Sequence, residues 1–141
     1  MPRYLLFIVH GESRRDDPVP EALYEEMGEF VNENRRTGVL VDTGGLRPTA
    51  EATRIRSSHG KLSVTDGPFA ETKEVVGGYA LIEVPSRAEA IDLATKFMDI
   101  HVRHWPEFEC ACEVREIESE PSPASASDES ADWSSRARPL D

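Results

Sequence analysis

Cysteine and basic residues are scarce in this chain, and each scarcity excludes a class of protein. The 141 residues include only two cysteines, Cys110 and Cys112. On an extended segment this spacing holds the two Cα atoms too far apart for an easy disulfide, so we expect free thiols in a reducing compartment. Lys and Arg number 16 against 27 Asp and Glu, a net charge of −11. Because nucleic-acid affinity depends on cationic side chains that neutralise phosphates, no direct nucleic-acid partner is expected.

Long hydrophobic runs and nucleotide-binding motifs are also missing. No apolar stretch approaches the ~18 residues that a membrane span needs. The short apolar run Tyr4 to Val9 lacks the flanking pattern of a secretory signal, so we predict a cytoplasmic protein without a membrane partner. The sequence contains no glycine-rich phosphate loop, nucleophile elbow, redox C-x-x-C or dinucleotide fingerprint, which disfavours nucleotide chemistry.

The first part of the chain alternates strand-like and helix-like segments. The continuous apolar run from Tyr4 to Val9 predicts a central strand. Apolar residues then recur at helical spacing and predict a helix near residues 20–37. A second strand starts at Val39 and should break at Gly44-Gly45, where paired glycines favour a bulge or a close backbone approach beside a pocket.

The second part repeats this order after a small hairpin. The hairpin strands are expected at 53–57 and 61–65, and a further strand at 79–84. The S-x-x-E pattern that begins at Ser86 is a capping box and starts a second helix. The last strand is expected at 111–117, where residue types alternate.

This order of elements predicts one ferredoxin-like α+β domain over residues 1–118, with an antiparallel sheet and both helices on one of its faces. Residues 119–141 are rich in Ser, Ala, Pro and acids and cannot bury enough apolar surface to offset the entropy of ordering. We predict a disordered acidic tail. Its lone aromatic residue, Trp133, docks on this chain, docks on a partner or stays undocked, and we favour the last.

The stretch from Thr65 to Val84 reads TDGPFAETKEVVGGYALIEV and is the most distinctive part of the sequence. Its residues Asp66 to Pro68 force a change of chain direction and give Phe69 a defined place to pack. A charged loop should follow, and Gly77-Gly78 should release the chain into the strand at 79–84.

The run DGPFAETKE resembles the signature of the YCII-related proteins, specifically their DGPF-domain branch, and FMDIHVRHWPEFE resembles the segment that follows the second helix there. The resemblance implies the same ferredoxin-like fold and adds a homodimer, a dimeric α+β barrel in which two sheets meet face to face. It implies no metal, and we predict no cofactor. Relatives in the wider barrel group include isomerases, dehalogenating proteins and cofactor-free monooxygenases.

Four residues are candidates for catalytic acid–base work. His10 ends the first predicted strand, where a side chain can reach a cavity between sheet and helices, or it simply forms a hydrogen bond at a strand end. Asp66 is either a carboxylate at a pocket mouth or a turn residue that caps amides, and we favour the turn. His101 and His104 lie three apart near the end of the second helix, where they transfer protons or stabilise the negative end of the helix dipole.

Four further residues are candidates for ligand binding. Glu71 and Lys73 offer an anion or proton-handling site, although weakly paired loop charges explain them equally well. Phe69 and Trp105 are aromatic residues at positions that the family resemblance covers.

The histidines and cysteines also form the pattern H-x2-H-x5-C-x-C, and tetrahedral zinc does accept two Cys and two His. The spacing departs from that of zinc fingers, and the loop containing Pro106 would have to return the thiols to the helix end. We therefore predict no metal.

Two functions are compatible with these residues. One is a small-molecule-binding protein, or a cofactor-independent enzyme that uses Asp and His in a cleft of the dimeric barrel. The other is a non-enzymatic regulatory protein, because DGPF-domain proteins are often encoded beside extracytoplasmic-function sigma factors. In that case the acidic tail would bind a basic partner.

Overall fold

The computed structural model describes residues 1–11, 18–69 and 73–119. In these residues the chain forms, in order, β1 (Arg3–Gly11), α1 (Glu21–Arg36), β2 (Leu40–Gly45), the short 3-10 helix η1 (Thr49–Glu51), β3 (Thr53–Ser58), β4 (Lys61–Asp66), β5 (Glu74–Glu83), α2 (Arg87–His104) and β6 (Cys110–Glu116). Neither helix is long and apolar enough to cross a membrane. The predicted tail, apart from Ser119, lies outside the described residues.

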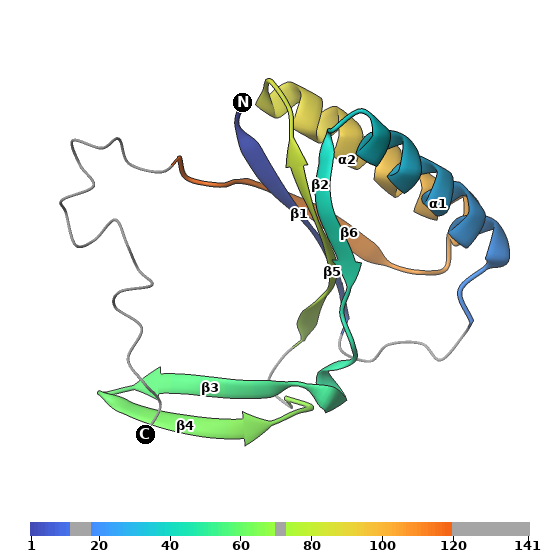
Figure 1. Cartoon of the computed structure of the whole chain (residues 1–141). Coiled ribbons are helices and arrows are strands. Elements are labelled where there is room, and N and C mark those ends of the chain that lie inside the picture. The colour runs from blue at the N-terminus through green and yellow to red at the C-terminus, as the bar shows by residue number, and fades with distance from the viewer. Residues whose placement is uncertain (12–17, 70–72, 120–141) are drawn as a thin grey trace, which may run out of the picture.

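The main sheet has the strand order β2-β5-β1-β6, and every neighbouring pair is antiparallel. Both helices pack on one face of this sheet (Figure 1). This is the ferredoxin-like α+β arrangement that the order of sequence patterns predicted. The hairpin of β3 and β4 is a separate two-stranded sheet, inserted between β2 and β5 and set apart from the main sheet (Figure 1).

The central core follows from alternation along β1. Tyr4 and Leu6 are buried on the helix side, together with Ile82 of β5 and Ala90 and Ala94 of α2. The residues between them, such as Leu5 and Phe7, are half-buried and point to the opposite face, because successive strand side chains alternate.

The capping box predicted at Ser86 begins α2. The Ser86 hydroxyl oxygen accepts a hydrogen bond from the Glu89 backbone N–H at 3.2 Å, and the hydroxyl donates to the Glu89 carboxylate, also at 3.2 Å. α2 therefore starts where the sequence predicted, and α1, which begins at Glu21, does so too.

The glycine-rich strands differ from the prediction. β2 continues through Gly44 and Gly45 instead of breaking there, and its irregularity lies earlier, between Leu40 and Asp42. β5 already starts at Glu74, which we had assigned to a loop, and it runs through both of its glycines. The register of β5 against β1 shifts beside Gly77, because residues Ile8 and Val9 pair with Gly78 and Val76. Pairing with β5 holds the β2 glycines in the sheet, and β5 itself is paired with β1 along its length, which local propensity does not reveal.

Candidate functional site

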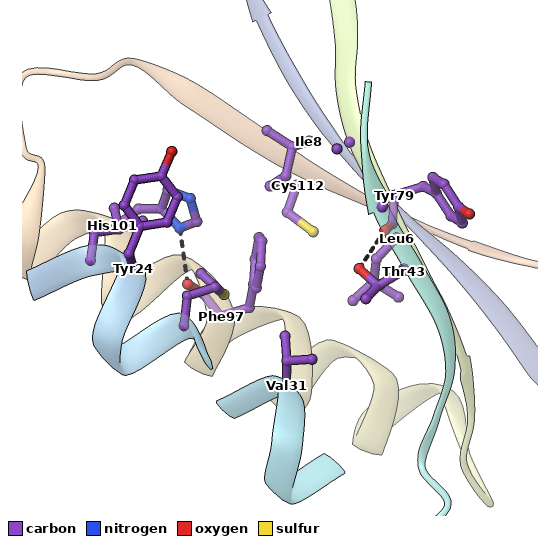
Figure 2. A pocket seen from close by; sticks show the side chains of 15 residues that line it. Leu6, Ile8, Tyr24, Val31, Thr43, Tyr79, Phe97, His101 and Cys112 are labelled. Atoms are coloured by element: carbon purple, nitrogen blue, oxygen red, sulfur yellow. Dashed lines mark hydrogen bonds between the residues drawn. The ribbon is translucent and has the colours of Figure 1, made fainter. Parts of the chain in front are cut away.

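A cavity of about 330 Å³ lies between the two helices and the main sheet. Its volume falls near the lower end of the range for small-molecule sites, roughly 300–1,000 Å³. The side chains in Figure 2 come from β1, β2, β5 and β6 on one side and from α1 and α2 on the other. The lining residues are Leu6, Ile8, Leu23, Tyr24, Met27, Val31, Thr43, Gly44, Gly45, Gly78, Tyr79, Ala80, Phe97, His101 and Cys112.

Small residues on the sheet create this space. Gly45, Gly78 and Ala80 line the cavity at positions where a large side chain would fill it. An added Cβ at Gly45 would meet no atom within 4 Å. Further along β5, Ile82 is almost fully buried and fills the corresponding layer of the core. The cavity therefore opens where the sheet changes from large to small residues.

His101 is the most deeply buried polar group of the cavity. It lies on the last turn of α2, and only 9% of its surface is exposed. Its Nδ1 lies 3.1 Å from the carbonyl oxygen of Phe97. A carbonyl only accepts, so Nδ1 carries a proton and donates, which leaves Nε2 as a hydrogen-bond acceptor in the neutral ring.

Three further polar side chains line the cavity. The Thr43 hydroxyl donates to the carbonyl oxygen of Tyr79 at 2.8 Å, so its oxygen still has a free lone pair. Burial raises the pKa of the Cys112 thiol to about 11, which keeps it protonated and unreactive near neutral pH. Tyr24 of α1 is 64% exposed and borders the cavity from the solvent side. Figure 2 shows Tyr24 and His101 at one end of the lining residues and Thr43 at the other.

A charged cluster ties the two helices together beside this cavity. The carboxylate of Glu26 on α1 accepts hydrogen bonds from the guanidinium of Arg103 and, at 2.9 Å, from Nε2 of His104, both on α2. Arg103 also donates to Asp99 at 2.7 Å. The hydrogen bonds from Arg103 and then from His104 lower the pKa of Glu26 to about 2, so this carboxylate is ionised at neutral pH.

The four catalytic candidates lie in different places. Only His101 lines the cavity. His104 turns to Glu26, so the two histidines do not share a site. His10 donates from Nδ1 to the Gly11 carbonyl oxygen at 2.9 Å, and its ring lies against Phe108 with centroids 5.7 Å apart.

Asp66, the fourth candidate, is the last residue of β4 and is exposed. Its carboxylate accepts a hydrogen bond from the Thr53 hydroxyl at 3.0 Å, across the hairpin. The next residue, Gly67, donates its backbone N–H to the Ala52 carbonyl oxygen at 2.8 Å. These contacts hold the base of the hairpin, and Asp66 does not line the cavity.

The ligand-binding candidates that the structure describes do not line the cavity either. Phe69 is buried, with the Arg54 guanidinium carbon 3.9 Å from its ring centroid. Trp105 belongs to a second core cluster with Leu23 and Ile100, where it stacks on Phe108. Lys73 is exposed just before β5, and Glu71 lies outside the described residues.

Sequence reasoning missed most of the cavity. Tyr24, Thr43 and Cys112 lie on three elements that only the fold brings together. Besides the candidate His101, the sequence signal for the cavity was Gly44-Gly45, which was expected to flank a pocket and does.

The cavity offers no metal site among the residues described. Across the described ranges no three His, Cys, Asp or Glu side chains come together as metal ligands, and both cysteines are free thiols. His101 and His104 face different partners, as above, which separates the two histidines of the zinc-like pattern.

The sequence also matches a protein-family model described as the YCII-related domain, over residues 3–97. The chain belongs to the YCII-related family. The matched region contains the helix α1, the strands β1 to β5 and most of α2, so it covers both walls of the cavity. His101 and Cys112 lie beyond it.

One relative of this YCII-related chain is an uncharacterised protein of Rhizobium meliloti (strain 1021). The two are 47% identical over 57 residues, which is 40% of this chain. The aligned part spans 46% of the relative's length, so the similarity concerns less than half of that protein.

Proposed function

We propose that this YCII-related protein binds a small, mainly apolar molecule in the cavity between its helices and its sheet. The observation that carries the proposal is the space of about 330 Å³ between helices and sheet, with mainly apolar walls and a single buried histidine. A cavity with apolar walls and a few convergent polar groups is the usual form of a small-molecule site. The ligand gains affinity mainly by removing apolar surface from water.

Filling the cavity tests this function directly. Ala80 lines the cavity opposite the helices, so the substitution Ala80→Leu adds volume where the ligand would lie. We expect the variant to lose at least tenfold in affinity for small apolar probes such as 4-propylanisole, measured by ligand-observed NMR. Ala22→Leu on the exposed side of α1 adds the same atoms outside the cavity and should bind as the wild type does. Equal binding by Ala80→Leu and the wild type would reject the cavity as the site.

The same site supports an enzymatic form of this proposal. His101 is the candidate for proton transfer, since Nδ1 is held by the Phe97 carbonyl and the residue lines the cavity, where Nε2 can exchange a proton with a ligand. Asp66 takes part in the hairpin contacts described above, which argues for His101 in place of an Asp and His pair. Loss of turnover in His101→Gln with ligand binding retained would support catalysis by this residue.

We also propose that the protein is a homodimer. The face of the main sheet opposite the helices presents half-buried apolar side chains, including Leu5, Phe7 and Leu81. In the described part of the chain both helices lie on the other face (Figure 1). A second sheet that meets this face would complete the dimeric barrel that the DGPF resemblance implies. The sigma-factor association stays a prediction. A pull-down that compares the full chain with a chain lacking residues 119–141 tests whether the tail binds the partner.

A further inference from the structure

We infer that the ligand of the cavity is an uncharged molecule with a hydroxyl or N–H group that donates a hydrogen bond to Nε2 of His101. This inference rests on the proposed function and names the chemical class that the cavity selects. An alcohol or a phenol with an apolar body is the simplest member of that class.

The first support is the unpaired nitrogen of His101. The Phe97 carbonyl fixes a proton on Nδ1, so Nε2 of the uncharged ring can only accept. Within the described residues no group donates to Nε2, although the side chain is 91% buried. Buried polar groups are nearly always hydrogen bonded, so an unpaired acceptor at the wall of a cavity points to a partner inside that cavity.

The second support is the absence of charge from the wall. None of the described lining residues is Asp, Glu, Lys or Arg. A buried carboxylate or phosphate without a cationic partner is strongly disfavoured, and so is a buried ammonium group without an anion. Arg103, the nearest charged residue in sequence on α2, is already paired with Glu26 and Asp99. The cavity therefore favours neutral ligands.

The third support comes from the opposite end of the cavity. The Thr43 hydroxyl uses its proton on the Tyr79 carbonyl, so it too offers an acceptor to the ligand. The middle of the cavity between these two ends is lined by Phe97, Val31 and Ile8, which are apolar (Figure 2). An apolar body with a donor group at one or both ends matches this arrangement.

Three probes of similar size separate the ligand classes. 4-Propylphenol can donate a hydrogen bond, 4-propylanisole can accept but not donate, and 4-propylbenzoate is an anion. We expect the full-length wild type to bind the phenol most tightly and the benzoate most weakly, as measured by NMR titration at pH 8. Replacing the imidazole in His101→Phe should lower the ratio of phenol to anisole affinity about three- to tenfold, the range expected for one neutral hydrogen bond.

Two further variants keep the test decisive. His101→Gln retains an acceptor and should recover part of the preference for the phenol. His59→Asn changes a histidine in the turn of the β3–β4 hairpin, where a φ of 51° suits Asn, and should leave all three affinities unchanged. Should His101→Phe fail to fold, the order of the three probes on the wild type still decides the question.

The outcomes distinguish this inference from the proposed function. Binding of phenol and anisole with a ratio that His101→Phe leaves unchanged would overturn the role of His101 but keep the cavity as a site. Tightest binding of the benzoate would overturn the neutral ligand class. Failure of all three probes to bind the wild type would reject the proposed function, and this inference with it.

Discussion

At the scale of single residues, some glycines stand where the fold leaves no room for a side chain. Gly67 has the least room among the glycines described. A Cβ at this position would collide with the backbone carbonyl oxygen of Thr49 in η1. A backbone atom cannot rotate away, unlike the end of a flexible side chain. The glycine of the DGPF run is thus required by the close approach between the hairpin base and η1.

We therefore predict that Gly67→Ala lowers the free energy of unfolding by about 1–3 kcal/mol, the usual cost of overpacking. Urea unfolding followed by circular dichroism measures this change. Gly28→Ala is the matched control, because an added Cβ there meets nothing within 4 Å and the residue lies inside α1. That variant should gain about 0.5–1 kcal/mol from helix propensity. A Gly67→Ala protein as stable as the wild type would disprove the collision.

A second close glycine contact lies where the register of β5 against β1 shifts. A Cβ at Gly77 would lie 2.6 Å from Nε2 of His10, whose ring packs over the strand. The ring of His10 thus fills the space that a side chain at Gly77 would occupy. This packing gives His10 a structural role.

At the scale of elements, the ion pairs of Glu26 join α1 to α2 and hold the helical wall of the cavity. Leu23, Tyr24 and Met27 of α1 line the cavity within one turn of Glu26. The carboxylate is bound by two side chains of the neighbouring helix, so its ionised form stabilises the packing of the helix pair.

This pairing predicts a specific pH dependence of stability. The pKa of Glu26 falls from 4.5 to about 2 in the folded protein, so the native state favours the ionised carboxylate. Its contribution is complete above the unfolded value of 4.5 and disappears as the pH falls through about 2. Glu26→Gln should therefore melt at a lower temperature than the wild type at pH 7, and the difference should shrink between about pH 5 and pH 2.

The control for this experiment is Glu33→Gln. Glu33 pairs with Arg36 on the same helix, and both side chains are largely exposed, so the substitution should have little effect on melting. A melting difference for Glu26→Gln that is constant from pH 7 to pH 2 would show that the ion pairs do not cause it.

At the scale of the whole molecule, the two faces of the main sheet have different surroundings. One face is covered by α1 and α2, while the hairpin of β3 and β4 stands apart from the sheet (Figure 1). The hairpin carries exposed apolar side chains at Ile55, Leu62 and Val64. At its base, Gly67 lies closely against Thr49 of η1 and donates its N–H to the Ala52 carbonyl oxygen.

The proposed dimer predicts that Phe7→Lys converts the protein to a monomer. Phe7 lies on the sheet face opposite the helices, where a buried lysine without a partner would be costly. Native mass spectrometry of untagged protein gives the oligomer mass directly, and circular dichroism confirms that the variant is folded. Val102→Lys places the same charge at an exposed position of α2 and should remain a dimer. A wild type that is monomeric at micromolar concentration would refute the proposal.

Local signals in the sequence were sufficient for the helices and for the type of fold. Periodic apolar residues predicted α1, and the capping box at Ser86 predicted the start of α2. The start of β5 at Glu74 was missed because charged residues and two glycines have low strand propensity. Pairing of this first part of β5 with Val9, His10 and Gly11 of β1 overrides that propensity.

The sequence by itself determined the ferredoxin-like order of elements, the family and the candidacy of His101, because each depends on residues close together in the chain. Only the tertiary structure decided that His101 lines a cavity while His104 pairs with Glu26, although the two are three positions apart. A cavity is the space left between α1, α2 and four strands, and it depends on which small residues of distant segments meet. Periodicity within any one segment carries no information about that meeting.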